Sequence, residues 1–144
     1  MPTKFCSDVQ IERIGRGLLD RSLPKREWTH AGHFAAALWL LRRRAVDVTV
    51  ELPKLIRAYN EATGVANTDF GGYHETITLA SIRAARGVLD RHGERAPLYS
   101  VVNSLLAGEL GRSDWLLLYW SRARLFSVEA RRVWIEPDLK PLPF

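Results

Sequence analysis

The sequence predicts an all-α protein: a single domain, residues 1–144, folded as a bundle of five to six helices. Apolar residues recur with helical spacing along most of the chain, and residues that typically begin or end helices separate these segments. The one β-branched stretch, "AVDVTVELP", has no strand-like partner nearby, so it does not predict a sheet. No internal repeat and no shift in composition divides the chain, which favours one domain.

N-cap residues mark the first two helices. Ser7 precedes an amphipathic segment that Pro24 interrupts. Thr29 precedes the second segment, which continues to about Arg43 and is apolar on nearly every side, so we expect it at the centre of the bundle. The β-branched stretch is interpreted as a connection, and the third helix is expected to begin near Leu52.

Glycine and proline divide the second half of the chain. A fourth helix is expected from about Tyr73 to Arg91, and a fifth from Pro97 to Gly111. A sixth follows the capping pair in "RSDW", and "SVEARRVW" adds a short turn. The last segment, "IEPDLKPLPF", contains three prolines, which predicts an irregular tail because proline cannot continue a helix.

Composition argues against several classes of protein. The longest apolar run, "FAAALWLL", has eight residues, whereas a membrane span needs about 20. The N-terminal segment lacks the apolar region of a secretory signal, and the single cysteine, Cys6, fits a reducing compartment, so we expect a cytoplasmic protein without membrane partners. The net charge of +5 comes from arginines interleaved with acidic residues, which makes nucleic acid an unlikely partner.

Three of the four histidines stand near expected helix starts. His30 and His33 are three residues apart, so their side chains can share one face of the second helix. His74 begins the fourth helix, and if successive helices alternate in direction, the two helix starts lie at the same end of the bundle. The partial positive charge of a helix N-terminus favours neutral imidazole, which is the form that binds metals or acts as a base.

These positions predict a polar site at one end of the bundle. We expect His30, His33 and His74 to bind a divalent metal ion (Zn, Fe, Mn or Ni), as in a metal-dependent enzyme acting on a small molecule. Glu75 and Tyr73 are the expected catalytic residues. The residues expected to contact the ligand are Asp69, Gly72 and Thr76.

Two alternatives remain open for the same residues. The first is a metal-free pocket that binds an acidic small molecule, because the glycines of "FGGYHET" can leave helix N-terminal amides approachable. The second is an interaction or structural protein in which the histidines are helix caps and packing residues. "HETIT" lacks the second histidine of the zincin motif, so it does not indicate a protease.

Three stretches resemble a family of small bacterial helical proteins: "WTHAGHFAAALWLL", "IRAYNEATGVANTDFGGYHETIT" and "LFSVEARRVWIEPDLKPLP". They carry the patterns THxxH, GYHETIT and WxEPDLxPLP. The resemblance extends over residues 28–143 and implies a compact helical bacterial protein. It implies no particular reaction, substrate or cofactor, so the functional prediction depends on the residues themselves.

Overall fold

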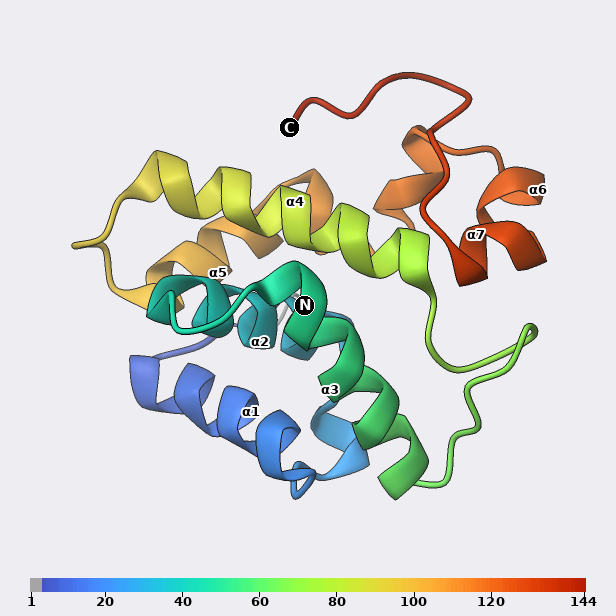
Figure 1. Ribbon diagram of the computed structural model, residues 1–144. Coiled ribbons are helices and arrows are strands. Elements are labelled where there is room, and N and C mark those ends of the chain that lie inside the picture. The colour runs from blue at the N-terminus through green and yellow to red at the C-terminus, as the bar shows by residue number, and fades with distance from the viewer. Residues whose placement is uncertain (1–3) are drawn as a thin grey trace.

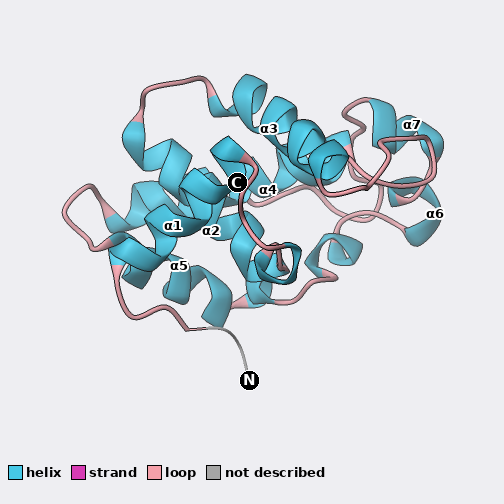
Figure 2. Ribbon diagram, turned by 90° about the horizontal axis from the view of Figure 1, so that it is seen from below, coloured by secondary structure: helices cyan, strands magenta, loops and turns pink. Residues whose placement is uncertain are grey.

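The structure, a computed structural model, describes residues 4–144 and is built from helices (Figures 1 and 2). Within these residues the only β-type pairing is an isolated bridge between Thr68 and Gly71, so the all-α prediction is confirmed. The α-helices are α1 (Asp8–Asp20), α2 (His30–Arg43), α3 (Val48–Ala62), α4 (Glu75–His92), α5 (Leu98–Ala107), α6 (Arg122–Leu125) and α7 (Val128–Arg132). The 3-10 helices are η1 (Lys25–Glu27), η2 (Glu109–Gly111) and η3 (Trp115–Leu118).

Helix α2 forms the centre of the bundle, in agreement with its nearly continuous apolar sequence. It contacts α1, α3, α4 and α5, and Ala35, Ala36 and Leu38 have no exposed surface. Its approach to α1 depends on a glycine: a Cβ atom on Gly15 would lie 2.2 Å from Cε3 of Trp39. The glycine therefore lets the indole pack directly on the α1 backbone.

Several predicted helix ends agree with the structure. Ser7 is the N-cap of α1, and Thr29 caps α2 by accepting a hydrogen bond from the Gly32 amide at 3.1 Å. Pro97 directly precedes α5, and Gly93, with φ of 78°, directly follows α4. These ends were predictable because capping depends on residues close together in the chain.

The start of α3 differs from the prediction. The helix begins at Val48 instead of near Leu52, because Asp47 caps it by accepting hydrogen bonds from the Thr49 amide (3.1 Å) and hydroxyl (2.6 Å). The stabilisation from this cap outweighs the low helix propensity of the β-branched residues that follow.

The expected fifth and sixth helices are shorter than predicted. Helix α5 ends at Ala107, and η2 occupies the stretch up to Gly111. The expected sixth helix, "DWLLLYWS", is the short 3-10 helix η3, and a separate helix that was not predicted, α6, follows it. The Ser121 hydroxyl caps α6 by accepting a hydrogen bond from the Arg124 amide. A hydroxyl cap of this kind favours a helix start at its own position.

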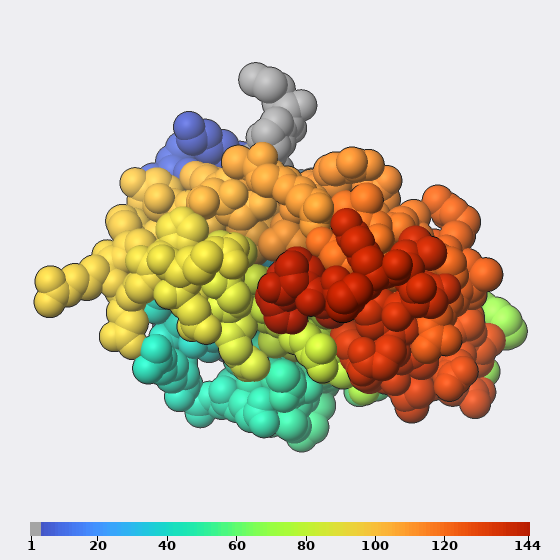
Figure 3. Space-filling model, turned by 90° about the horizontal axis from the view of Figure 1, so that it is seen from above, coloured from blue at the N-terminus to red at the C-terminus, as the bar shows by residue number. Residues whose placement is uncertain are grey.

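The C-terminal third packs against one end and one side of α4. Figure 1 shows α6 and α7 beside the start of α4, and residues 133–144 contain neither helix nor strand. The end of the tail lies across the bundle surface (Figure 3), where the Phe144 and Trp115 ring centroids are 6.0 Å apart. No helix within residues 4–144 is long and apolar enough to cross a membrane.

Candidate functional site

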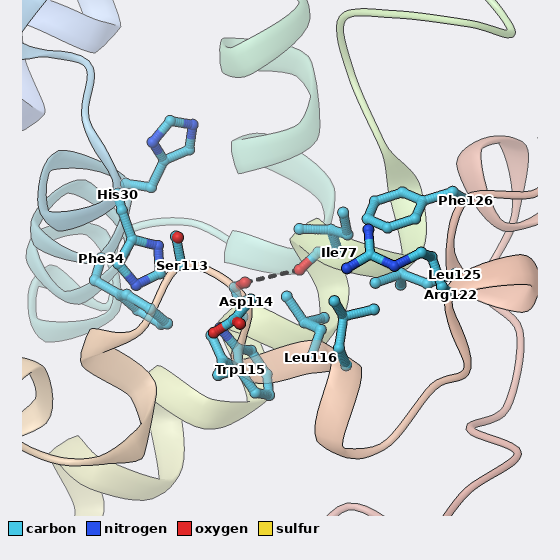
Figure 4. A pocket seen from close by; sticks show the side chains of 13 residues that line it. His30, Phe34, Ile77, Ser113, Asp114, Trp115, Leu116, Arg122, Leu125 and Phe126 are labelled. Atoms are coloured by element: carbon cyan, nitrogen blue, oxygen red, sulfur yellow. Dashed lines mark hydrogen bonds between the residues drawn. The ribbon is translucent and has the colours of Figure 1, made fainter.

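A pocket of about 370 Å³ lies where the first turns of α2 and α4 approach the segment 113–126 (Figure 4). This volume falls within the range of about 300–1,000 Å³ that is usual for small-molecule sites. Its apolar wall comes from three separate parts of the chain. The apolar side chains are Phe34, Ile77, Leu116, Leu117, Leu125 and Phe126.

His30 lines this pocket from the first residue of α2. Its Nε2 atom lies 2.7 Å from the carbonyl oxygen of Leu110, and its ring meets Phe34 edge to face with centroids 5.3 Å apart. A carbonyl oxygen only accepts hydrogen bonds, so Nε2 carries the proton. In the neutral ring, Nδ1 then has a free lone pair.

His33 lines the same pocket with the opposite tautomer. Its Nδ1 atom lies 2.6 Å from the carbonyl oxygen of Thr29 and therefore donates, which leaves the lone pair on Nε2. One face of the ring stacks on Trp28 at 3.7 Å, while the residue keeps an exposed edge. Desolvation is the main cause that lowers the pKa of His33, and His30 adds to the effect.

His74 does not line the pocket, and its expected place in the first turn of α4 is corrected to the N-cap position. Its Nδ1 accepts a hydrogen bond from the Ile77 amide at 3.2 Å, and its Nε2 donates to the carbonyl oxygen of Leu125 at 2.8 Å. The residue is 7% exposed. Both ring nitrogens are therefore engaged in hydrogen bonds that stabilise the fold, as expected for a buried capping residue.

The three histidines are thus divided between two places. His30 and His33 share the pocket, whereas the His74 ring is directed to a backbone carbonyl of α6. Residues 4–144 contain no group of three or more His, Cys, Asp or Glu side chains that could hold a metal ion. Metal binding by His30 and His33 stays a prediction, without His74 as an available third ligand.

Tyr73 and Glu75, the expected catalytic residues, pair with each other outside the pocket lining. The Tyr73 hydroxyl donates to Oε1 of Glu75 at 2.5 Å, and the Arg57 guanidinium lies over the tyrosine ring at 4.1 Å. Burial is the main cause that raises the pKa of the Tyr73 hydroxyl, and the hydrogen bond to Glu75 raises it further. This pair lies where the chain enters α4.

Asp69 and Gly72, expected to contact a ligand, instead contact α7. Asp69 accepts from Nε of Arg132 at 2.7 Å, and the Gly72 carbonyl accepts from Nη1 of Arg131 at 3.1 Å. Gly72 has φ of 78°, and a Cβ atom there would lie 2.5 Å from the Ala66 carbonyl oxygen. The glycine is therefore required by the turn itself, as expected for a residue with positive φ.

Thr76, the third expected ligand contact, binds the chain that leaves α7. Its hydroxyl donates to the Val133 carbonyl oxygen at 2.8 Å and accepts from the Ile135 amide at 3.2 Å. The side chain has no exposed surface. We call the contacts of Asp69, Gly72, His74 and Thr76 with residues 125–135 the C-terminal clamp.

Arg122 and Trp115 are among the pocket residues that the sequence did not indicate. Arg122, at the start of α6, lines the pocket and makes no ion pair with any described carboxylate. Trp115, 1% exposed, also lines the pocket, and its Nε1 atom is buried without a hydrogen-bond partner in residues 4–144. In the sequence, Trp115 looks like an ordinary core residue and Arg122 like one of many surface arginines. Nothing in their neighbouring residues indicates a binding site.

Comparison with models of protein families, with curated proteins and with solved structures gave no match. The assignment of a function therefore depends on the geometry of the pocket.

The pKa of His74 predicts a pH-dependent contribution to stability. Burial is the main cause that lowers this pKa below its usual value of 6.5, and the Arg131 guanidinium adds to the effect. The unfolded chain then binds a proton more readily than the folded one, so the stabilising contribution is complete above pH 6.5 and declines as the pH falls through the folded-state pKa.

The measurement is urea unfolding of the wild type and of His74→Asn between pH 8 and 5, conditions chosen around a histidine pKa of about 6.5. The difference in unfolding free energy between the two proteins should be constant above that pKa and smaller below it. A difference that stays constant throughout this interval would show that the pKa of His74 is not lowered in the folded state.

Proposed function

We propose that this protein binds a small organic acid with an apolar body in the pocket between α2, α4, η3 and α6. The observation that carries the proposal is the Arg122 guanidinium, a cation without an ion-pair partner among the described residues, beside a largely apolar cavity. Its planar N–H groups match the two oxygens of a carboxylate.

The other arginines near Arg122 are already engaged. Arg124 donates to the Glu136 carbonyl, Arg131 to the carbonyls of Gly72 and Tyr73, and Arg132 to the Asp69 carboxylate. Arg122 is exposed and takes no part in these interactions, and its guanidinium lies 5.8 Å from the Phe126 ring centroid. It is therefore the cation of this region that is available to a ligand.

The acidic residue at the pocket does not cancel this charge. Asp114 lines the cavity, but its carboxylate accepts from Nε of Arg112 at 3.2 Å and is paired outside the pocket. The apolar wall supplies the second half of the recognition, because burial of a hydrocarbon body adds roughly 25 cal/mol per Å². This proposal follows the metal-free alternative and needs neither His74 nor a bound ion.

The proposal is tested by measuring the binding of 3-phenylpropionate, a small acid with an aromatic body, by titration calorimetry or ligand-observed NMR. Replacing Arg122 with Gln should weaken binding about tenfold, the usual effect of losing one charge-assisted hydrogen bond at a partly exposed site. The matched control is Arg95→Gln, which removes an exposed arginine between α4 and α5 and should leave binding unchanged. Equal affinity of wild type and Arg122→Gln, or no binding by the wild type at millimolar concentration, would contradict the proposal.

A further inference from the structure

The charged side of the pocket belongs to α6, a helix of four residues. Arg122 and Leu125 stand three residues apart on this helix and both line the pocket, as expected for two positions on one helix face. Figure 4 shows them on the side of the pocket away from Phe34, with Ile77 of α4 between. The position of α6 relative to α4 therefore decides where the Arg122 guanidinium lies against the apolar wall.

One hydrogen bond joins α6 to the helices that precede it. Its donor is Nε2 of His74, the N-cap of α4, and its acceptor is the carbonyl oxygen of Leu125, at 2.8 Å. Among residues 4–144, no other hydrogen bond links α6 or its capping serine to α1–α5 and their caps. The other long-range hydrogen bonds of this segment go to residues 136–138 of the tail. The bond from His74 is thus the directional link between α6 and the bundle.

The two ring nitrogens of His74 each bind a residue of the pocket wall. Nδ1 accepts from the amide of Ile77 at 3.2 Å, and Ile77 and Leu125 line the pocket from different helices. The buried imidazole therefore connects α4 with α6. Apolar contacts between the two sides are non-directional, whereas a hydrogen bond fixes both a distance and a direction.

We propose that His74 is a positioning residue of the pocket, which sets the place of Arg122 for the carboxylate of the bound acid by holding the carbonyl of Leu125. This inference rests on the proposed function, because it concerns the same pocket. His74 does not line the cavity, so the acid binds without contacting it and the effect passes through α6. A guanidinium binds both oxygens of a carboxylate only in a matched geometry, so a shift of α6 weakens recognition of the charge in particular.

The test compares two ligands with the same body: 3-phenylpropionate, which carries the charge, and 3-phenylpropan-1-ol, which does not. The ratio of their affinities measures recognition of the carboxylate separately from folding and from apolar contact. The wild type should prefer the acid about tenfold, the effect assigned to Arg122. His74→Asn keeps a favoured cap residue but loses the donor to Leu125, and it should lower this preference about three- to fivefold.

Three further variants separate positioning from stability. His74→Gln carries an amide donor long enough to extend to the Leu125 carbonyl, so it should restore most of the preference. Asn103→Ala is the matched control, because Asn103 makes two hydrogen bonds with the distant Phe5 backbone and does not line the pocket. It should destabilise the protein and leave the preference unchanged. In an Arg122→Gln background, His74→Asn should not change the preference further, because the group that it positions is gone.

A measurement on the wild type does not depend on the folding of any variant. Because binding at Arg122 and the His74 hydrogen bond are linked, each should stabilise the other. In protein labelled with ¹⁵N in its histidines, exchange of the His74 Nε2 proton should slow more with 3-phenylpropionate than with the alcohol at equal occupancy. An unchanged preference in His74→Asn, together with equal exchange under the two ligands, would overturn the positioning role and leave the proposed function standing. If 3-phenylpropionate did not bind the wild type, the proposed function would fail and the inference with it.

Discussion

Replacing Thr76 with Val should destabilise the protein by about 2–3 kcal/mol, because two backbone groups lose their partner at a buried position. Valine has nearly the shape of threonine, so the change removes the hydroxyl without opening a cavity. The Val133 carbonyl and the Ile135 amide, which this hydroxyl satisfies, would both be left without it. Urea unfolding followed by circular dichroism measures the loss.

The location of the damage distinguishes the C-terminal clamp from a general defect. Hydrogen exchange in Thr76→Val should accelerate first in residues 133–137, while α1 and α2 remain protected. Ser104→Ala, which removes an exposed hydroxyl of α5 without a described hydrogen bond, should change stability by less than about 0.5 kcal/mol. Wild-type stability and exchange in Thr76→Val would show that the hydroxyl does not hold the tail.

Replacing His74 with Ala should cost about 2–4 kcal/mol. About 1 kcal/mol comes from the lost N-cap of α4, and the rest from the buried Leu125 carbonyl, which loses the hydrogen bond from Nε2. The result would be measured as a lower urea midpoint with an unchanged slope.

A matched variant separates the two roles of His74. Asparagine is a favoured N-cap residue, but its shorter side chain does not extend to the Leu125 carbonyl. His74→Asn should therefore recover about 1 kcal/mol of the loss in His74→Ala. Stoichiometric metal in the wild-type protein that disappears in His74→Asn would contradict the structural role and restore His74 as a metal ligand.

The sequence predicted the fold best where local chemistry determines the structure. Thr29, Pro97 and Gly93 stand at helix boundaries in both the prediction and the structure, because their effects act within one helical turn. The start of α3 differs from the prediction because the β-branched residues after Asp47 are typical of extended chain, whereas the Asp47 carboxylate caps a helix. Helix α6 was not predicted, because its four residues are too few to show a helical apolar pattern.

The site was harder to predict because its chemistry depends on long-range packing. The spacing of His30 and His33 correctly put them on one helix face, and the pocket includes both. The direction of the His74 ring is set by the Leu125 carbonyl, 51 residues away in sequence. Arg122 was not predicted because its distinguishing feature is that it has no ion-pair partner among the described residues, which no sequence pattern records.

The distinctive motifs also gain a physical explanation. "GYHETIT" contains three residues of the C-terminal clamp, Gly72, His74 and Thr76, and "RVWIEPDLKPLP" contains the backbone that Thr76 holds. The two motifs therefore contact each other. Their residue types follow from holding the tail in place and need no catalytic role.

The position of the clamp in the sequence has a consequence for the order of folding. Thr76 and Val133 are 57 residues apart, and closing so long a loop is entropically slower than forming the contacts between neighbouring helices. During synthesis α1 to α5 leave the ribosome before the residues that complete both clamp and pocket, because the N-terminal part of a chain emerges first. If the proposed acid binds in this pocket, binding should therefore begin only at the final step of folding, and the acid should stabilise the chains that have completed that step.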